Sequence, residues 1–113
     1  MLQTALEQLD SKINATAITG LTSSACALFT VVTTRRQTVS LLVVPTDAEV
    51  DTMTSDTRFF FASLEGLSTT DAELAVLPFP SLEVDPYRGL APHLEVASAR
   101  ATALSALVRG SAR

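Results

Sequence analysis

A glycine followed by a short polar loop and an apolar segment stands near the start of the chain, at Gly20. This order is typical of a phosphate-binding loop, whose pattern is G-x-x-x-x-G-K-[ST]. There the second glycine lets backbone N–H groups surround the phosphates, the lysine reaches the β- and γ-phosphates, and the hydroxyl binds magnesium. Counted from Gly20, these three positions hold Ala25, Cys26 and Ala27, so all three functional residue types are missing. The sequence predicts a degenerate Walker A loop, which indicates recognition or scaffolding rather than nucleotide turnover.

Two other residue types capable of chemistry occur once each, as Cys26 and His93. A metal site or an acid–base centre needs several such groups close together, and neither residue has a second cysteine or histidine as partner. We expect Cys26 to be buried and inert, and His93 to cap or hydrogen-bond the start of the last helix. The carboxylates are scattered over capping and solvent positions. The sequence therefore predicts no catalytic residue, no metal site and no bound cofactor in this chain.

The composition of the 113 residues indicates one domain or part of one, because 47% of them are hydrophobic and can form a core. The net charge of −4 argues against nucleic-acid binding by this chain alone, which would need a basic surface. Glu7 and Asp10 lie where a secretory signal needs positive charge, and the longest apolar run, residues 41–45, is too short for a bilayer. These features predict a cytoplasmic protein that does not enter a membrane.

Hydrophobic periodicity predicts four helices that alternate with three short strands. The helices are expected over residues 2–12, 24–36, 46–66 and 93–108, and the strands over residues 15–21, 38–45 and 75–79. Thr46 and Glu49 form a capping box at the start of the third helix, and Gly66 and Gly110 are expected to end the last two. Residues 54–57 are weak helix formers and predict a break in the third helix.

This alternation favours right-handed βαβ crossovers and a parallel sheet. We expect residues 1–113 to form a single partial α/β domain, a three-layer P-loop-like fold whose sheet is flanked by helices. Three strands leave an apolar sheet edge, so we expect the chain to be truncated and the edge to be covered by its own missing domains or by a partner.

Apolar side chains at helical spacing define the expected buried faces. On the third helix they are Val50, Met53, Phe60, Phe61 and Leu64. On the last helix they are Leu94, Ala97, Ala101, Leu104, and Leu107 or Val108. Since Phe59, Phe60 and Phe61 cannot all point inward from one helix, we expect at least one of them to be exposed.

The loop after the last predicted strand lies where α/β proteins place ligands. Tyr87 and Arg88 on this loop would be available to stack on DNA, but a single tyrosine makes packing onto the connection, rigidified by Pro86 and Pro92, the expected role. We expect Arg100 to make a structural contact.

One segment has a distinctive pattern of the form Pro-Tyr-x4-Pro-His, followed by an arginine and a leucine. Its residues are Pro86, Tyr87, Pro92, His93, Arg100 and Leu104. Together with the loop opening at residues 20–22 and the apolar run ending in Pro45, it resembles the N-terminal, UvrB-like region of the bacterial transcription-repair coupling factors (Mfd). The loss of the phosphate-binding lysine is similar to that region and differs from UvrB, whose loop keeps the lysine.

The resemblance implies a role in transcription-coupled nucleotide-excision repair. Members of this family recognise stalled RNA polymerase and displace it with a C-terminal ATP-driven DNA translocase, which uses ATP and magnesium. The UvrB-like module recruits UvrA, mainly through a following domain. The resemblance thus implies that this chain is a non-hydrolysing N-terminal fragment, with DNA contacts and the motor in other domains.

Two alternatives remain open from the residues. The chain could be a fragment of a UvrB-type excision-repair helicase subunit, against which the missing lysine argues. It could also be a small standalone α/β nucleotide-binding module or enzyme, which would need an acid–base pair or an activated nucleophile.

Overall fold

The computed structural model describes residues 17–35, 39–82, 87 and 89–113, and within these residues the regular structure is helical. The helices are α2 (Ser23–Thr34), α3 (Asp47–Glu65), α4 (Thr69–Ala75) and α5 (Leu94–Arg109). No β-strand occurs in these described ranges. The predicted three-layer α/β fold with a parallel sheet is therefore wrong, while three of the four predicted helices are present. The predicted helix over residues 2–12 lies outside the described residues.

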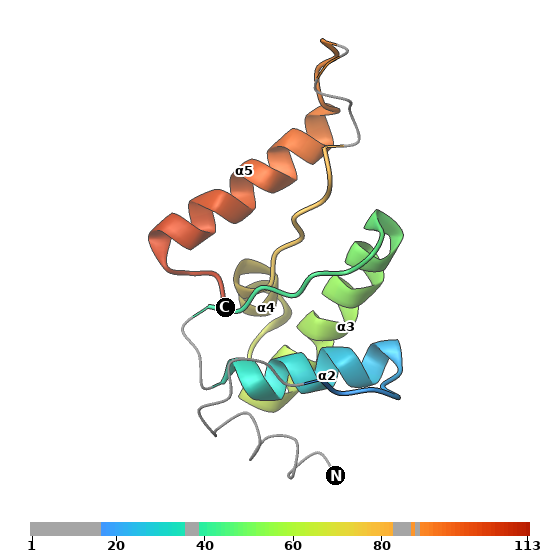
Figure 1. Ribbon diagram of the computed structural model, residues 1–113. Coiled ribbons are helices and arrows are strands. Elements are labelled where there is room, and N and C mark those ends of the chain that lie inside the picture. The colour runs from blue at the N-terminus through green and yellow to red at the C-terminus, as the bar shows by residue number, and fades with distance from the viewer. Residues whose placement is uncertain (1–16, 36–38, 83–86, 88) are drawn as a thin grey trace.

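Helix α3 is the centre of the arrangement, because both α2 and α4 pack against it. Figure 1 shows α2 crossing the end of α3, and α5 standing to one side beyond the extended segment that follows α4. The core cluster consists of Val31 from α2, Phe61 from α3, and Ala72 and Ala75 from α4. Small residues on α4 let it approach α3 closely, so one phenylalanine can fill the space between three helices.

The third predicted strand is extended but does not join a sheet. Pro78 and Pro80 have no backbone N–H to donate to a ladder. The carbonyl oxygens of Val76 and Pro80 instead accept hydrogen bonds from Arg58 Nε (2.9 Å) and Arg100 (2.7 Å). The hydrogen-bonding capacity of this segment is therefore used by arginine side chains and not by a neighbouring strand. In addition, Ala75 belongs to α4, which removes the first residue of the predicted strand.

The second predicted strand, over residues 38–45, is also wrong, because its described residues, 39–45, form no strand. Leu41 and Val43 are 83% and 81% exposed, whereas Val44 is only partly accessible. Without a paired strand on either side, this segment has one face against the molecule and the other in solvent. Residues 17–21, the described part of the first predicted strand, are not in a strand either.

The helix ends follow the sequence signals closely. Thr46 caps α3 by accepting a hydrogen bond from Glu49 N–H (3.3 Å), and its hydroxyl donates to Glu49 Oε2 (2.9 Å). Gly66 and Gly110 end α3 and α5 in the left-handed conformation, at φ +65° and +72°, as predicted. Helix α4 was not predicted, although Ser68 and Asp71 form a similar cap at its start.

Helix α3 continues through residues 54–57, so the predicted break is wrong. Thr57 is buried against the interior, and the helix is supported by α2 and α4, so tertiary contacts outweigh the weak local propensity. Phe59 is 66% exposed, which confirms that the three phenylalanines do not all point inward. Phe61 is buried, whereas Leu64, which was expected in the core, is exposed.

The buried face of α5 differs from the predicted one. Ala103 and Ala106 are buried, and Arg100 lies on the same side one turn earlier. The large apolar residues of the predicted face are exposed: Leu94, Leu104, Leu107 and Val108. The buried apolar residues of α5 are thus alanines and not its large side chains, so hydrophobic spacing alone selected the wrong face.

Candidate functional site

The loop at Gly20 leads directly into the N-terminus of α2, as the sequence predicted. Gly20 has a φ of +81°, a conformation that favours glycine. Thr22 is the N-cap of α2, and its Oγ1 accepts a hydrogen bond from Ala25 N–H at 3.3 Å. The carbonyl of Thr22 accepts from Cys26 N–H at 2.9 Å. The backbone therefore turns from glycine into helix within two residues.

These hydrogen bonds occupy backbone groups that a phosphate-binding loop keeps for its ligand. A phosphate at a helix N-terminus is bound by N–H groups that have no partner within the helix. Here the Ala25 N–H is capped by Thr22, and the Cys26 N–H belongs to the first helical turn. The loop thus has fewer N–H groups available to an anion than a functional phosphate-binding loop.

A carboxylate lies at the same end of α2. Ser24 Oγ donates a hydrogen bond to Asp56 Oδ2 of α3 at 3.0 Å. The positive end of the α2 dipole favours this carboxylate. A nucleotide phosphate that approached Ser24 would meet the negative charge of Asp56. The ion pair found in the described chain, between Arg35 and Glu65, is at the opposite end of α2.

The positions that correspond to lysine and hydroxyl in a phosphate-binding loop differ in their surroundings. Cys26, which was expected to be buried, is partly buried. Its carbonyl accepts from Thr30 Oγ1 at 2.8 Å. Ala27 is completely buried at 0% exposure. A hydroxyl at residue 27 would face the interior, where it could not reach a magnesium ion in solvent.

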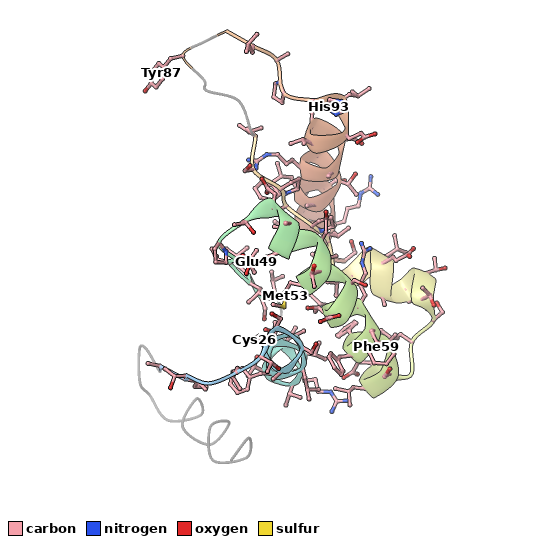
Figure 2. All side chains as sticks on the ribbon, turned by 90° about the vertical axis from the view of Figure 1, so that its right-hand side faces the viewer. Cys26, Glu49, Met53, Phe59, Tyr87 and His93 are labelled. Carbon is pink, nitrogen blue, oxygen red and sulfur yellow. The ribbon has the colours of Figure 1, made fainter. Side chains whose placement is uncertain are left out.

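The residues of the Pro-Tyr…Pro-His…Arg segment lie far from this loop. Figure 2 shows Tyr87 and His93 at one end of the molecule and Cys26 on α2 at the other. Tyr87 is 95% exposed. His93 is the N-cap residue of α5, at the expected place, and its carbonyl accepts from Ala97 N–H at 3.0 Å, although its side chain makes no capping hydrogen bond. Pro86 and Arg88 lie outside the described residues, and Pro92 is exposed.

Arg100 is the member of this segment with the clearest structural role. It donates to the Pro80 carbonyl at 2.7 Å, and its guanidinium carbon lies 3.9 Å from the centre of the Phe79 ring. This geometry combines a charge-assisted hydrogen bond with a cation–π contact. Arg100 therefore fixes α5 to the extended segment before it, which confirms the expected structural contact. Leu104, one turn further along, is 52% exposed.

A polar junction between Asp47 and Ser81 was not predicted. Asp47 Oδ1 accepts from Ser81 N–H at 2.8 Å, and Oδ2 accepts from the Ser81 hydroxyl. The hydroxyl bond, followed by the backbone bond, holds the pKa of the Asp47 carboxyl below its ordinary value of 3.8. Asp47 is recognisable in sequence only as an acidic residue in the first turn of a helix. Its partner lies 34 residues further along the chain, so only the folded structure reveals the pair.

Comparison with known proteins finds no matching family model, no matching curated protein and no matching solved structure. Within the described ranges, no three His, Cys, Asp or Glu residues form a group that could hold a metal ion. No helix of the described chain has both the length and the apolar character needed to cross a bilayer.

Proposed function

We propose that this chain is a non-hydrolysing interaction module of transcription-coupled nucleotide-excision repair, of the type found at the N-terminus of the transcription-repair coupling factors. It would serve as a scaffold in recruiting the UvrA repair machinery. The proposal rests on the Pro86-Tyr87…His93…Arg100 segment and on the Gly20 loop. It does not rest on a shared sheet architecture.

The observation that carries the non-hydrolysing part of the proposal is the closed N-terminus of α2. Thr22 caps the Ala25 N–H, and the Asp56 carboxylate accepts from Ser24. Both features oppose phosphate binding, in addition to the missing lysine. A loop of this kind is suited to a structural role, since it joins two segments without holding a nucleotide.

The scaffold part of the proposal is supported by the exposed apolar surface of the described chain. Leu41, Val43, Leu94 and Val108 are each at least 80% exposed. Apolar side chains this exposed are available for contact with another protein. Under this proposal, ATP, magnesium and DNA interact with other parts of a coupling factor, and RNA polymerase and UvrA are partners of the whole protein.

The test is strand-specific repair in the source cell. Deletion of the gene is expected to abolish the faster removal of ultraviolet photoproducts from the transcribed strand, while repair of the non-transcribed strand continues. Reintroducing the parent gene, or one carrying Arg109→Ala as a matched surface control, restores the difference. Arg100→Ala restores less of it, because Arg100 holds the Pro80 segment. An unchanged strand difference after deletion would contradict the proposal.

A further inference from the structure

The apolar segment that leads into α3 has the side-chain alternation of a strand. Figure 1 shows it running without helical turns toward the start of α3. Leu41 and Val43 are 83% and 81% exposed, whereas Ser40 and Val44 are partly buried. Leu42, between the two exposed residues, is 40% exposed. A period of two is that of a β-strand with one face against the molecule and the other in solvent.

The backbone groups of this segment lack hydrogen-bond partners. Within the described chain, the N–H and C=O groups of residues 40–44 form no hydrogen bond. In the other extended segment, by contrast, the carbonyls of Val76 and Pro80 are each bound by an arginine. Unpaired N–H and C=O groups along an extended apolar segment are a template for a further strand. Residues 40–44 therefore have the properties of a strand edge without its partner.

A proline decides which edge of the segment is able to pair. In an extended chain, the N–H and C=O groups of alternate residues point to the same edge. Ser40, Leu42 and Val44 share one edge, and each has an N–H to donate. The odd-numbered residues share the other edge with Pro45, which has no N–H and is tolerated where an edge stays unpaired. The even-numbered residues therefore provide the edge that can form a continuous ladder.

The segment is complementary to a second copy of itself in the antiparallel direction. If Leu42 lies opposite Leu42 of the second copy, residues 39–45 of the two copies pair along their whole length. Leu41 of each copy then lies opposite Val43 of the other, in a non-hydrogen-bonded pair, where facing side chains approach most closely. The two most exposed apolar side chains of the segment thus cover each other.

The distribution of charge also favours a second copy in this direction. Residues 39–45 contain no charged side chain, so no like charges meet across the two-fold axis. Arg35 and Arg36 precede the segment in sequence, and Asp47 and Glu49 follow it. Antiparallel pairing places the basic flank of one copy next to the acidic flank of the other, whereas parallel pairing places like charges together. The flanking charges therefore select the antiparallel arrangement.

We propose that residues 39–45 pair with the same residues of a second copy as an antiparallel two-stranded ribbon, which makes the chain a symmetric dimer. Alternate residues, beginning with Ser40, exchange backbone hydrogen bonds across the axis, and Leu41 and Val43 cover each other on the outer face. Because the contact is short, the association is weak and reversible. Because Pro45 interrupts the opposite edge, pairing stops at two copies. The proposal goes beyond the proposed role in repair and does not depend on it.

Sedimentation equilibrium of the chain over a series of concentrations tests the dimer. We expect a reversible monomer–dimer equilibrium with a dissociation constant of about 100 μM. Leu41→Lys is expected to weaken the association about tenfold, because it removes the apolar contact with Val43 of the other copy. Val108→Lys is the matched control: it makes the same change of charge at a residue that is 89% exposed on α5, and it leaves the dissociation constant unchanged.

Three results of this experiment would overturn the proposal. The first is a chain that stays monomeric up to about 1 mM, which would leave the segment to a strand of another protein. The second is a species larger than a dimer, which would show that both edges pair. The third is equal weakening by Leu41→Lys and Val108→Lys, which would show that the segment is not the contact.

A charge pair and amide hydrogen exchange test the register. Leu41→Lys combined with Val43→Glu places opposite charges across the axis, so the double variant should associate at least about fivefold more tightly than Leu41→Lys alone. In the dimer of the parent chain, exchange should slow at the amides of Ser40, Leu42 and Val44 and stay unchanged at Leu41 and Val43. Absence of rescue by the double variant, or equal slowing at all five amides, would refute the assigned pairing.

Discussion

Two phenylalanines on α3, Phe59 and Phe61, provide a matched test of how the helices pack. Phe61 is 8% exposed and belongs to the core cluster with Val31, Ala72 and Ala75. Phe59 is 66% exposed and makes an edge-to-face contact with Phe60, with ring centres 5.3 Å apart. Truncation of either residue to alanine changes helix propensity equally, so the difference between the variants reports tertiary packing.

We expect Phe61→Ala to lower the free energy of unfolding by about 3 kcal/mol. This is the low end of the range for buried phenylalanine. Phe61 lines a cavity between α2, α3 and the segments 40–46 and 76–81, so it has fewer contacts to lose. Phe59→Ala should cost about 1 kcal/mol or less, from its exposed contact with Phe60. The difference corresponds to about 8 °C in melting temperature for a chain of this size.

The assay is urea unfolding followed by far-UV circular dichroism, with the melting temperature as a second measure. If Phe61→Ala does not fold, Phe61→Leu serves in its place, with a smaller loss that still exceeds that of Phe59→Leu. Equal losses for the two positions, or a larger loss at Phe59, would refute the packing of α2 and α4 around Phe61.

Three further predictions concern polar contacts. Thr22→Ala should lower stability by about 1 kcal/mol, measured by urea unfolding, because the α2 cap at Ala25 is lost; no loss would show that the cap is not formed. Because Ser81 lowers the folded-state pKa of Asp47, the ionised carboxylate stabilises the fold above the ordinary value of 3.8, and this contribution disappears as the pH falls through the lower folded pKa. Acid titration of stability should therefore be flatter in Asp47→Asn, and identical curves would refute the contact. Arg100→Ala should cost about 1–2 kcal/mol and accelerate hydrogen exchange in α5, since the Pro80 and Phe79 contacts disappear; unchanged exchange would contradict this role.

The sequence predicted the local structure better than the global one. Caps and stops depend on a few neighbouring residues, which is why Thr46, Gly66 and Gly110 were placed correctly. Helix α4 could have been found from the same kind of signal, since Ser68 precedes Asp71 at capping distance. Its seven residues were too short for hydrophobic periodicity to reveal.

The local sequence pattern could not decide whether the predicted strands pair into a sheet. An apolar run such as residues 39–44 has the composition of a buried strand, but whether it pairs depends on partners elsewhere in the chain. The arginines that bond the Val76 and Pro80 carbonyls lie 18 and 20 residues away in sequence, and no periodicity indicates them. In the same way, the buried face of α5 is set by Ala103 and Ala106, which hydrophobic spacing did not single out.

At the Gly20 loop, the sequence showed which residues are missing, whereas the structure adds what stands in their place. Cys26 stands at the lysine position of the motif, which is enough to show that the lysine is missing. The Asp56 carboxylate beside Ser24 comes from a different helix, 32 residues away, and could not be inferred from the motif. This second feature makes a specific prediction, because restoring the lysine should not restore binding.

Equilibrium titration with labelled ATP and magnesium tests the central claim most directly, that this module holds no nucleotide. We expect no saturable binding up to about 1 mM for the parent chain, and none for Cys26→Lys, because Thr22 still caps the helix and Asp56 still repels phosphate. A dissociation constant in the micromolar range for the parent would contradict the claim. Micromolar binding by Cys26→Lys alone would show that the missing lysine, and not the closed helix terminus, is what prevents binding.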